Sequence, residues 1–243
     1  MISYLKCQFY FIFNQKTLII SVILNGLIGL IFVYQSNFYL GKQIIDANQT
    51  FYNAIYIENC VIFVKIISVT YCIFLFSTNY TIESNKFAIY LLNYKKYRKM
   101  FNFTKLVILM TVFLWFMFNE MILFHLVLEI LTPLSVSFTI SVPIFFVLFL
   151  ESLFFGLLAS IIIFLIKHPF SAIISTVIFW ILEIFSSSQD FKSAKFVNRI
   201  KEFIPLLYKE ENSYIVTSYL SNYILLILLV VLIVYMFSTI NEL

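Results

Sequence analysis

Five ionisable side chains stand in stretches of the chain that are otherwise apolar: Glu58, Lys65, Glu120, His125 and Glu151. A charged group inside a bilayer costs about 2.5–3.5 kcal/mol on insertion scales, so such groups mark candidate paths for a substrate, an ion or a proton. The structural alternative is a protonated or hydrogen-bonded side chain that joins two helices. Each of the five is therefore a candidate site residue.

Glu151 and Glu120 are the strongest of these candidates. Apolar residues flank Glu151 for many positions on both sides, and Glu120 stands beside Asn119 in a similar setting. We expect either carboxyl group to be protonated or hydrogen-bonded between helices. Spacing along the chain leaves a structural task and a place in a substrate or proton path both open.

Two further spacings predict how these groups are paired. Glu58 and Lys65 are seven residues apart, on nearly one face of a helix but about 10 Å apart along its axis. A partner on another helix is therefore expected for Lys65, rather than Glu58. His125 and Glu129 are four residues apart and are expected to form a solvated local pair.

The motifs of enzymes and of metal sites are missing from the sequence. It has only two histidines and three cysteines, and it contains no HExxH, CxxC or Walker A pattern. Cys7, Cys60 and Cys72 are expected to be small packing residues. We expect no catalytic activity, no cofactor and no metal in this chain, so that any energy that it uses would come from a partner or from a gradient.

The composition predicts a protein that lies in a membrane. Of the 243 residues, 62% are hydrophobic and 12% are charged, and the mean hydropathy is +0.99. A soluble domain has about 45–50% apolar and about 25% charged residues. The net charge of +4 comes from basic residues at the edges of apolar segments, a distribution that predicts no nucleic-acid partner.

Six segments contain about the 20 apolar residues that a membrane span requires. The expected fold is an all-α, polytopic membrane protein with about six transmembrane helices in one domain, 1–243. Pro143, near the start of the fourth segment, predicts a tilt, a kink or a start above the membrane. The segments are 17–35, 54–77, 105–128, 136–166, 170–186 and 216–238.

Basic residues predict the orientation of these spans. The loop 79–104 is rich in Lys and Arg and should be cytoplasmic, together with both chain termini. The loops 36–53 and 187–215 and the turn Glu129–Pro133 then lie outside. The loop 187–215 also carries basic residues, but they are less dense than those of 79–104.

Two segments have the pattern of amphipathic helices. Residues 1–16 carry apolar side chains at helical spacing and predict a helix at the membrane surface before the first span. Residues 191–207 carry an apolar stripe opposite a charged face, which predicts an extracellular surface helix before the last span.

The order of residue types in the loop 79–104 is the starting point for a resemblance. Glu83 opens the loop, Leu91-Leu92 follows, then the basic run 95–99, and Lys105 begins the third span. The N-terminal amphipathic segment, the spaced Gly156, Ser160, Ala172 and Trp180, and the helix 191–207 complete the pattern. The layout of the whole chain resembles the permease subunit of an ABC-2-type exporter.

This resemblance implies two kinds of protein partner. A separate cytoplasmic ATPase subunit, which itself binds ATP and Mg²⁺, would dock on the N-terminal elbow helix and on the coupling loop 79–104. A second permease chain, identical or paralogous, would complete the transporter. The implied ATPase contacts are Glu83, Phe87, Leu91, Tyr94, Lys95, Lys96, Arg98 and Lys99.

The resemblance also implies a direction and a location. Small outer loops leave no domain for capturing a solute, so the family suggests export of an amphipathic peptide, lipid or drug from a bacterial cell. The chain would lie in the cell membrane, and its size is similar to that of exporters of antimicrobial peptides and lantibiotics.

Three other functions stay open on the sequence alone. The chain is also compatible with a membrane scaffold or immunity protein that transports nothing. A secondary transporter would use Glu120 and Glu151 as its proton or ion groups. A membrane enzyme is the remaining alternative.

Overall fold

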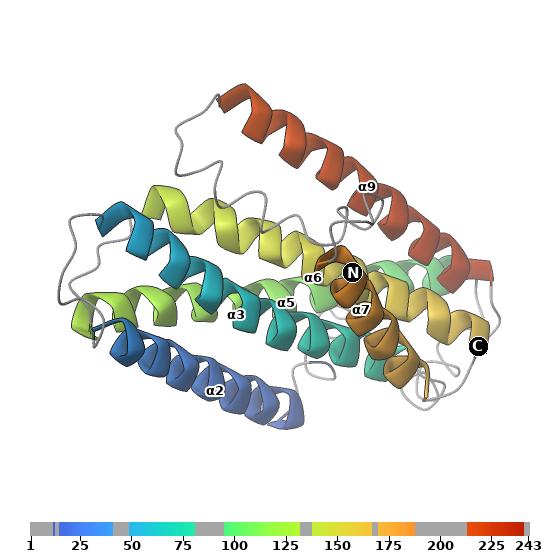
Figure 1. Ribbon diagram of the computed structural model, residues 1–243. Coiled ribbons are helices and arrows are strands. Elements are labelled where there is room, and N and C mark those ends of the chain that lie inside the picture. The colour runs from blue at the N-terminus through green and yellow to red at the C-terminus, as the bar shows by residue number, and fades with distance from the viewer. Residues whose placement is uncertain are drawn as a thin grey trace.

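The computed structural model describes residue 12 and residues 15–40, 49–80, 95–131, 138–166, 170–187 and 213–240. All regular structure within these ranges is helical, which confirms the all-α class. Successive helices run in opposite directions (Figure 1). The helices are α2 (Gln15–Leu40), α3 (Gln49–Asn79), α5 (Lys95–Leu131), α6 (Phe138–Ile166), α7 (Ser171–Ser187) and α9 (Ser213–Ile240).

Four of these helices are long and apolar enough to cross a membrane. Their apolar spans are Lys16–Ser36, Asn59–Asn79, Met100–Val127 and Ser141–Ile166. Helix α7 has only 17 residues, and α9, with 28 residues, contains the apolar segment Ile224–Met236 within the part whose side chains the structure describes. The chain is thus a membrane-embedded protein with four candidate spans among the described residues, at positions close to the first four that were expected.

The distribution of polar side chains fits this setting. Lys65, Glu120 and Glu151 are buried, whereas Leu30 and Leu225 are among many large apolar side chains that are exposed. In a soluble protein charged side chains are almost never fully buried. An apolar outer surface around buried polar groups is expected when the surrounding solvent is lipid.

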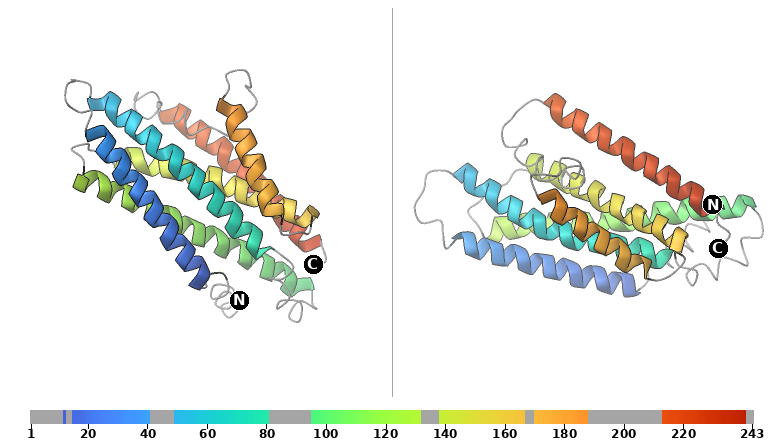
Figure 2. Two further views of the ribbon diagram at one scale, coloured as in Figure 1. Left: turned by 60° about the horizontal axis from the view of Figure 1, so that its bottom comes forward. Right: turned by 45° about the vertical axis from the view of Figure 1, so that its right-hand side comes forward.

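Helices α3 and α6 form the centre of the bundle. They share its most extensive contact, α2, α5 and α7 also contact α3, and α9 packs on α6. Helices α3 and α6 run in the same direction, as the two views of Figure 2 show. They approach closely at Gly156, where a Cβ would lie 2.6 Å from Cys72 Sγ and 3.3 Å from its carbonyl oxygen.

The first span has its own glycines, Gly26 and Gly29. A Cβ at either would meet no atom of the described residues within 4 Å. The structure therefore shows a close helix contact at Gly156 of α6 and none at Gly26 or Gly29 of α2.

The helix that contains the third expected span, 105–128, extends beyond that span at both ends. Helix α5 begins at Lys95, so Lys95, Lys96, Arg98 and Lys99 belong to its first two turns and not to a loop. The reason is local: Lys and Arg favour helices, and residues 80–104 contain neither Gly nor Pro. Helix α5 also continues to Leu131, so Glu129 is helical and not part of a turn.

The fourth span is a single helix, α6, that contains Pro143. Proline lies in the second turn, where it removes one backbone hydrogen bond near the start of the helix. The helix therefore continues through it to Ile166.

Several expectations lie outside the described residues. These are the elbow helix 1–16 apart from Ile12, Gln15 and Lys16, the contacts Glu83, Phe87, Leu91 and Tyr94, and the outer helix 191–207. Of the first segment, Ile12 is buried in the main hydrophobic core.

Candidate functional site

An ion pair connects the two central helices. Lys65 Nζ of α3 lies 3.4 Å from Glu151 Oε2 of α6, and only 2% and 0% of the two side chains is exposed. The partner of Lys65 is thus on another helix, as its spacing from Glu58 predicted. Burial inside a lipid-embedded bundle removes both charges from water, so each charge depends strongly on the other.

A second acidic side chain, from α5, also meets α3. Ser68 Oγ lies 3.0 Å from one carboxyl oxygen of Glu120 and 3.3 Å from the other. Both side chains are fully buried. Helices α3 and α5 are therefore joined by a hydrogen bond between side chains, as was expected for Glu120.

These two contacts belong to one small region. Lys65 and Ser68 are three residues apart on α3, so they share a face and are separated by about 4.5 Å along the axis. Glu120 from α5 and Glu151 from α6 thus converge on one turn of α3. We call Lys65, Ser68, Glu120 and Glu151 the polar layer; it contains one basic and two acidic groups.

A further hydroxyl group lies at the same level. Ser152, next to Glu151, is fully buried, and its Oγ has no hydrogen-bond partner among the described residues. It precedes Gly156 by one turn of α6 and so shares the face that packs on Cys72. Ser68 likewise precedes Cys72 by one turn of α3. Because α3 and α6 run in the same direction, Ser152 and Ser68 lie at about the same level of the bundle.

His125 does not occupy the polar layer. Its Nε2 lies 2.6 Å from Ser141 Oγ, and its ring stacks on Phe138 with centroids 3.8 Å apart. Both partners are on α6, and the expected partner, Glu129, is an exposed residue one turn further along α5 that also interacts electrostatically with His125. His125 therefore ties the end of α5 to the start of α6.

Lys105 is a buried cation at the opposite end of α5. It is 1% exposed, and its Nζ lies 5.1 Å from the ring centre of Tyr80 and 5.8 Å from that of Phe101. Both distances are within the reach of a cation–π interaction. Lys105 thus connects the start of the α5 span to the end of α3.

Other expected site residues are not brought into the polar layer. Asn119 donates a hydrogen bond to the carbonyl oxygen of Trp115, 3.0 Å away on its own helix. Glu58 belongs to α3, two turns before Lys65. The basic residues of the run 95–99 lie in the first turns of α5, far along the same helix from Glu120.

The hydroxyl groups of the site could not be identified from the sequence. Ser68, Ser141 and Ser152 stand among apolar residues in the same way as several other serines do. A helix that is apolar all round shows no preferred buried face, so no signal distinguishes the serines that meet an acid or a histidine.

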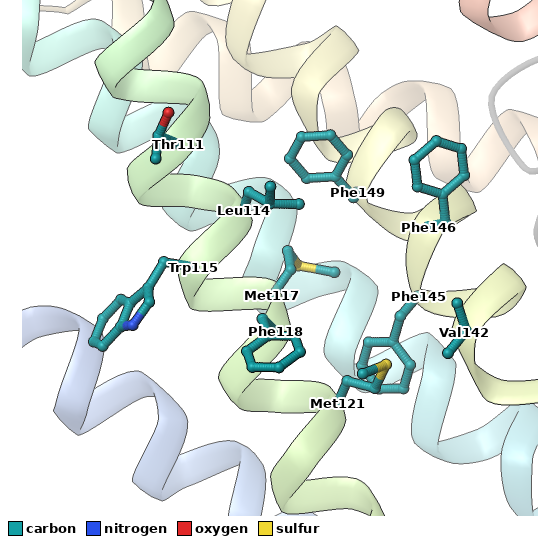
Figure 3. Close-up of a pocket in the computed structure, with 10 residues that line it drawn as sticks. All are labelled: Thr111, Leu114, Trp115, Met117, Phe118, Met121, Val142, Phe145, Phe146 and Phe149. Atoms are coloured by element: carbon teal, nitrogen blue, oxygen red, sulfur yellow. The ribbon is translucent and has the colours of Figure 1, made fainter. Parts of the chain in front are cut away.

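An apolar groove lies between α5 and α6, and Figure 3 shows side chains from both helices around it. Its volume is about 530 Å³. Half-exposed aromatic residues such as Phe118 and Phe146 place it at the outer surface of the bundle. The lining residues are Thr111, Leu114, Trp115, Met117, Phe118, Met121, Val142, Phe145, Phe146 and Phe149.

The described residues contain no group of three or more His, Cys, Asp or Glu side chains that could hold a metal ion. No family model, no curated protein and no solved structure matches this chain.

Proposed function

We propose that this chain is the membrane-spanning subunit of an ATP-driven exporter, and that a separate ATPase docks at the end of the bundle where α5 begins. The observation that carries the proposal is the extension of α5. The helix begins at Lys95, whereas its apolar span begins at Met100. Four of the five residues between these points are basic, so the extension has the charge expected of a cytoplasmic end.

A helical extension is a suitable coupling element. Helix α5 is continuous from Lys95 to Leu131 and carries Glu120 in the polar layer. A displacement imposed on its first turns is therefore transmitted along a rigid element to the contact with Ser68 on α3. Tilting of packed helices in response to nucleotide binding by a partner is a known form of switching.

The end of the bundle from which α5 extends is shared by several elements. Helix α2 begins there, and α3 and α6 end there, as Figure 1 shows. An ATPase bound at this end would contact the chain through more than one helix. A second copy or paralogue of this chain would supply the other half of the transporter.

The groove between α5 and α6 favours an amphipathic molecule as the proposed substrate. Its volume of about 530 Å³ is in the range of small-molecule sites, about 300–1,000 Å³. It opens toward the surface that faces lipid, so an apolar or amphipathic molecule would reach it from within the bilayer. The proposed cargo is therefore a peptide, lipid or drug with a large apolar part.

Co-purification tests this function. The tagged chain is extracted gently from its native host membrane, and bound proteins are identified by mass spectrometry. We expect a stoichiometric subunit with a Walker A sequence. Charge reversal of Lys95, Lys96, Arg98 and Lys99 to Glu should remove that subunit while the chain stays in the membrane.

A matched control reverses the four basic residues Lys192, Lys195, Arg199 and Lys201 in the loop 187–215. These residues are expected on the opposite side of the membrane, so the ATPase should be retained. Absence of any ATPase, under conditions that keep a known transporter complex intact, would contradict the proposal.

A further inference from the structure

We propose that the polar layer is a proton-binding site, in which Glu120 holds an exchangeable proton beside the Lys65–Glu151 ion pair. This inference goes beyond the exporter proposal and does not depend on a partner ATPase. It assigns a ligand, the proton, to a cluster at which α3, α5 and α6 meet.

The first argument is the balance of charge. The layer contains one ammonium group and two carboxyl groups, and the Lys65 ammonium lies 3.4 Å from Glu151. Glu120 has the Ser68 hydroxyl within 3.0 Å, and a hydroxyl group carries no charge. A second carboxylate would leave a net negative charge inside the bilayer, where a buried carboxyl group takes up a proton instead.

The second argument is that no other helix brings a compensating charge. The elements packed on α5 are α2, α3, α6 and α9. Helix α2 has one charged residue, Lys16, in its first turn, and α9 has none. Lys65 and Glu151 are the charged groups that α3 and α6 bring to the polar layer, and Glu58 lies two turns before Lys65 on α3. On the same half of α5, His125 contacts Ser141 and Glu129 is exposed.

The third argument comes from hydroxyl groups next to the layer. The hydroxyl groups of Ser152 and Tyr71 are buried and have no hydrogen-bond partner among the described residues. Tyr71 follows Ser68 by one turn of α3, and Phe116 precedes Glu120 by one turn of α5. The ring centroids of Tyr71 and Phe116 are 4.4 Å apart. Buried polar atoms of this kind call for partners, and a hydroxyl group can both accept and donate a proton.

The geometry also indicates which helix contacts depend on the proton: those of α3 with α5 and with α6. The protonated carboxyl of Glu120 is a neutral hydrogen-bond donor and acceptor toward Ser68. Loss of the proton places two carboxylates against one ammonium, so that Lys65 is shared between α5 and α6. Proton binding therefore favours the observed contact of α3 with α5 and the separate ion pair between α3 and α6.

Labelling with a hydrophobic carbodiimide tests the site. The reagent, dicyclohexylcarbodiimide, adds the O–H of a protonated carboxyl group across one C=N bond, and the adduct rearranges to a stable N-acylurea. The full chain in native membrane vesicles is treated at a series of pH values, and labelled peptides are mapped by mass spectrometry. We expect label on Glu120 that decreases about tenfold per pH unit once the acid titrates.

Two variants give the test its specificity. Glu120→Gln should lose the label, and Lys65→Met should add label at Glu151, because that acid then also takes up a proton. Glu129, which is exposed, provides a solvent-facing carboxyl for comparison and should stay unlabelled near neutral pH.

Infrared difference spectroscopy covers the case in which the reagent fails to reach the site. A protonated carboxyl group has a C=O stretch that is separate from the carboxylate bands. The expected result is a pH-dependent C=O band that is absent from Glu120→Gln and present in Glu129→Gln. Wild-type protein without a band that depends on Glu120 would overturn the proposal, as would label on Glu120 that is indifferent to pH.

Discussion

Helices α6 and α2 look alike as sequences and differ in the structure. Both are apolar helices with glycine in the middle of a span. Gly156 of α6 lies so close to α3 that a Cβ would meet Cys72 Sγ at 2.6 Å, whereas Gly26 and Gly29 of α2 have open space around the missing Cβ. Apolar surface alone therefore does not determine which helix lies at the centre.

The polar side chains of the two helices differ in the same way. Glu151 of α6 pairs with Lys65, whereas Asn25 of α2 has a buried side-chain oxygen with no hydrogen-bond partner among the described residues. In lipid, close packing at small residues and polar contacts between helices take the place of the hydrophobic effect. The comparison teaches that these few residues, rather than hydropathy, place α6 at the centre and α2 at the periphery.

The largest loss of stability is expected when one charge of the Lys65–Glu151 ion pair is removed. Glu151→Gln leaves the Lys65 ammonium buried without its counter-charge, and breaking a buried pair in this way costs about 3–5 kcal/mol. We expect the variant to be strongly destabilised, which is measured as a lowered Tm in mild detergent and a lowered yield of folded protein.

Asn25→Leu is the matched control on α2. It replaces a side chain whose oxygen lacks a partner, so the Tm should be unchanged or slightly raised. A Tm loss at Asn25→Leu as large as that at Glu151→Gln would remove the distinction between the two helices.

The next largest Tm difference between α6 and α2 is expected from substitution of their glycines. Gly156→Val forces α3 and α6 apart, since its Cβ conflicts with Cys72 Sγ and with the backbone oxygen of Cys72. Overpacking of this kind costs about 1–3 kcal/mol. Thermal unfolding should show a clear Tm loss for Gly156→Val and little change for Gly29→Val; equal losses would place α2 in a packed interface that the structure does not show.

A smaller effect is expected at Ser68. Ser68→Ala removes the hydrogen bond with Glu120, and such contacts between helices in a bilayer average about 0.6 kcal/mol. Thr70→Val is the control, because Thr70 is exposed and its hydroxyl donates to the carbonyl oxygen of Ile66 on its own helix. The Tm of Ser68→Ala should be lower than that of Thr70→Val, and an inverse order would argue against the polar layer.

Much of the architecture follows from the sequence because spans are defined by hydropathy and length. The first four apolar segments coincide closely with α2, α3, α5 and α6. The helical extension before the third span was not predicted because that span was bounded by its apolar residues, although Lys and Arg are good helix formers.

The sequence predicts that polar side chains join different helices, but it does not identify which residues pair. That Lys65 has its partner on another helix follows from its spacing, but the spacing does not identify that partner. Helices that are apolar on all sides show no buried face, so nothing in the sequence indicates that Glu151 meets Lys65 and Glu120 meets Ser68. The difference between Gly156 and Gly29 was hidden for the same reason.

The most direct test of the central claim, that α3 and α6 are joined by the Lys65–Glu151 pair, is a double-mutant cycle. The Tm is measured for wild type, Lys65→Met, Glu151→Met and the variant with both substitutions. Each single change should lower the Tm strongly, and the double variant should recover most of the loss, because an apolar pair of similar volume replaces a buried ion pair well. Additive losses in the double variant would contradict the account, since they would mean that the two side chains do not interact.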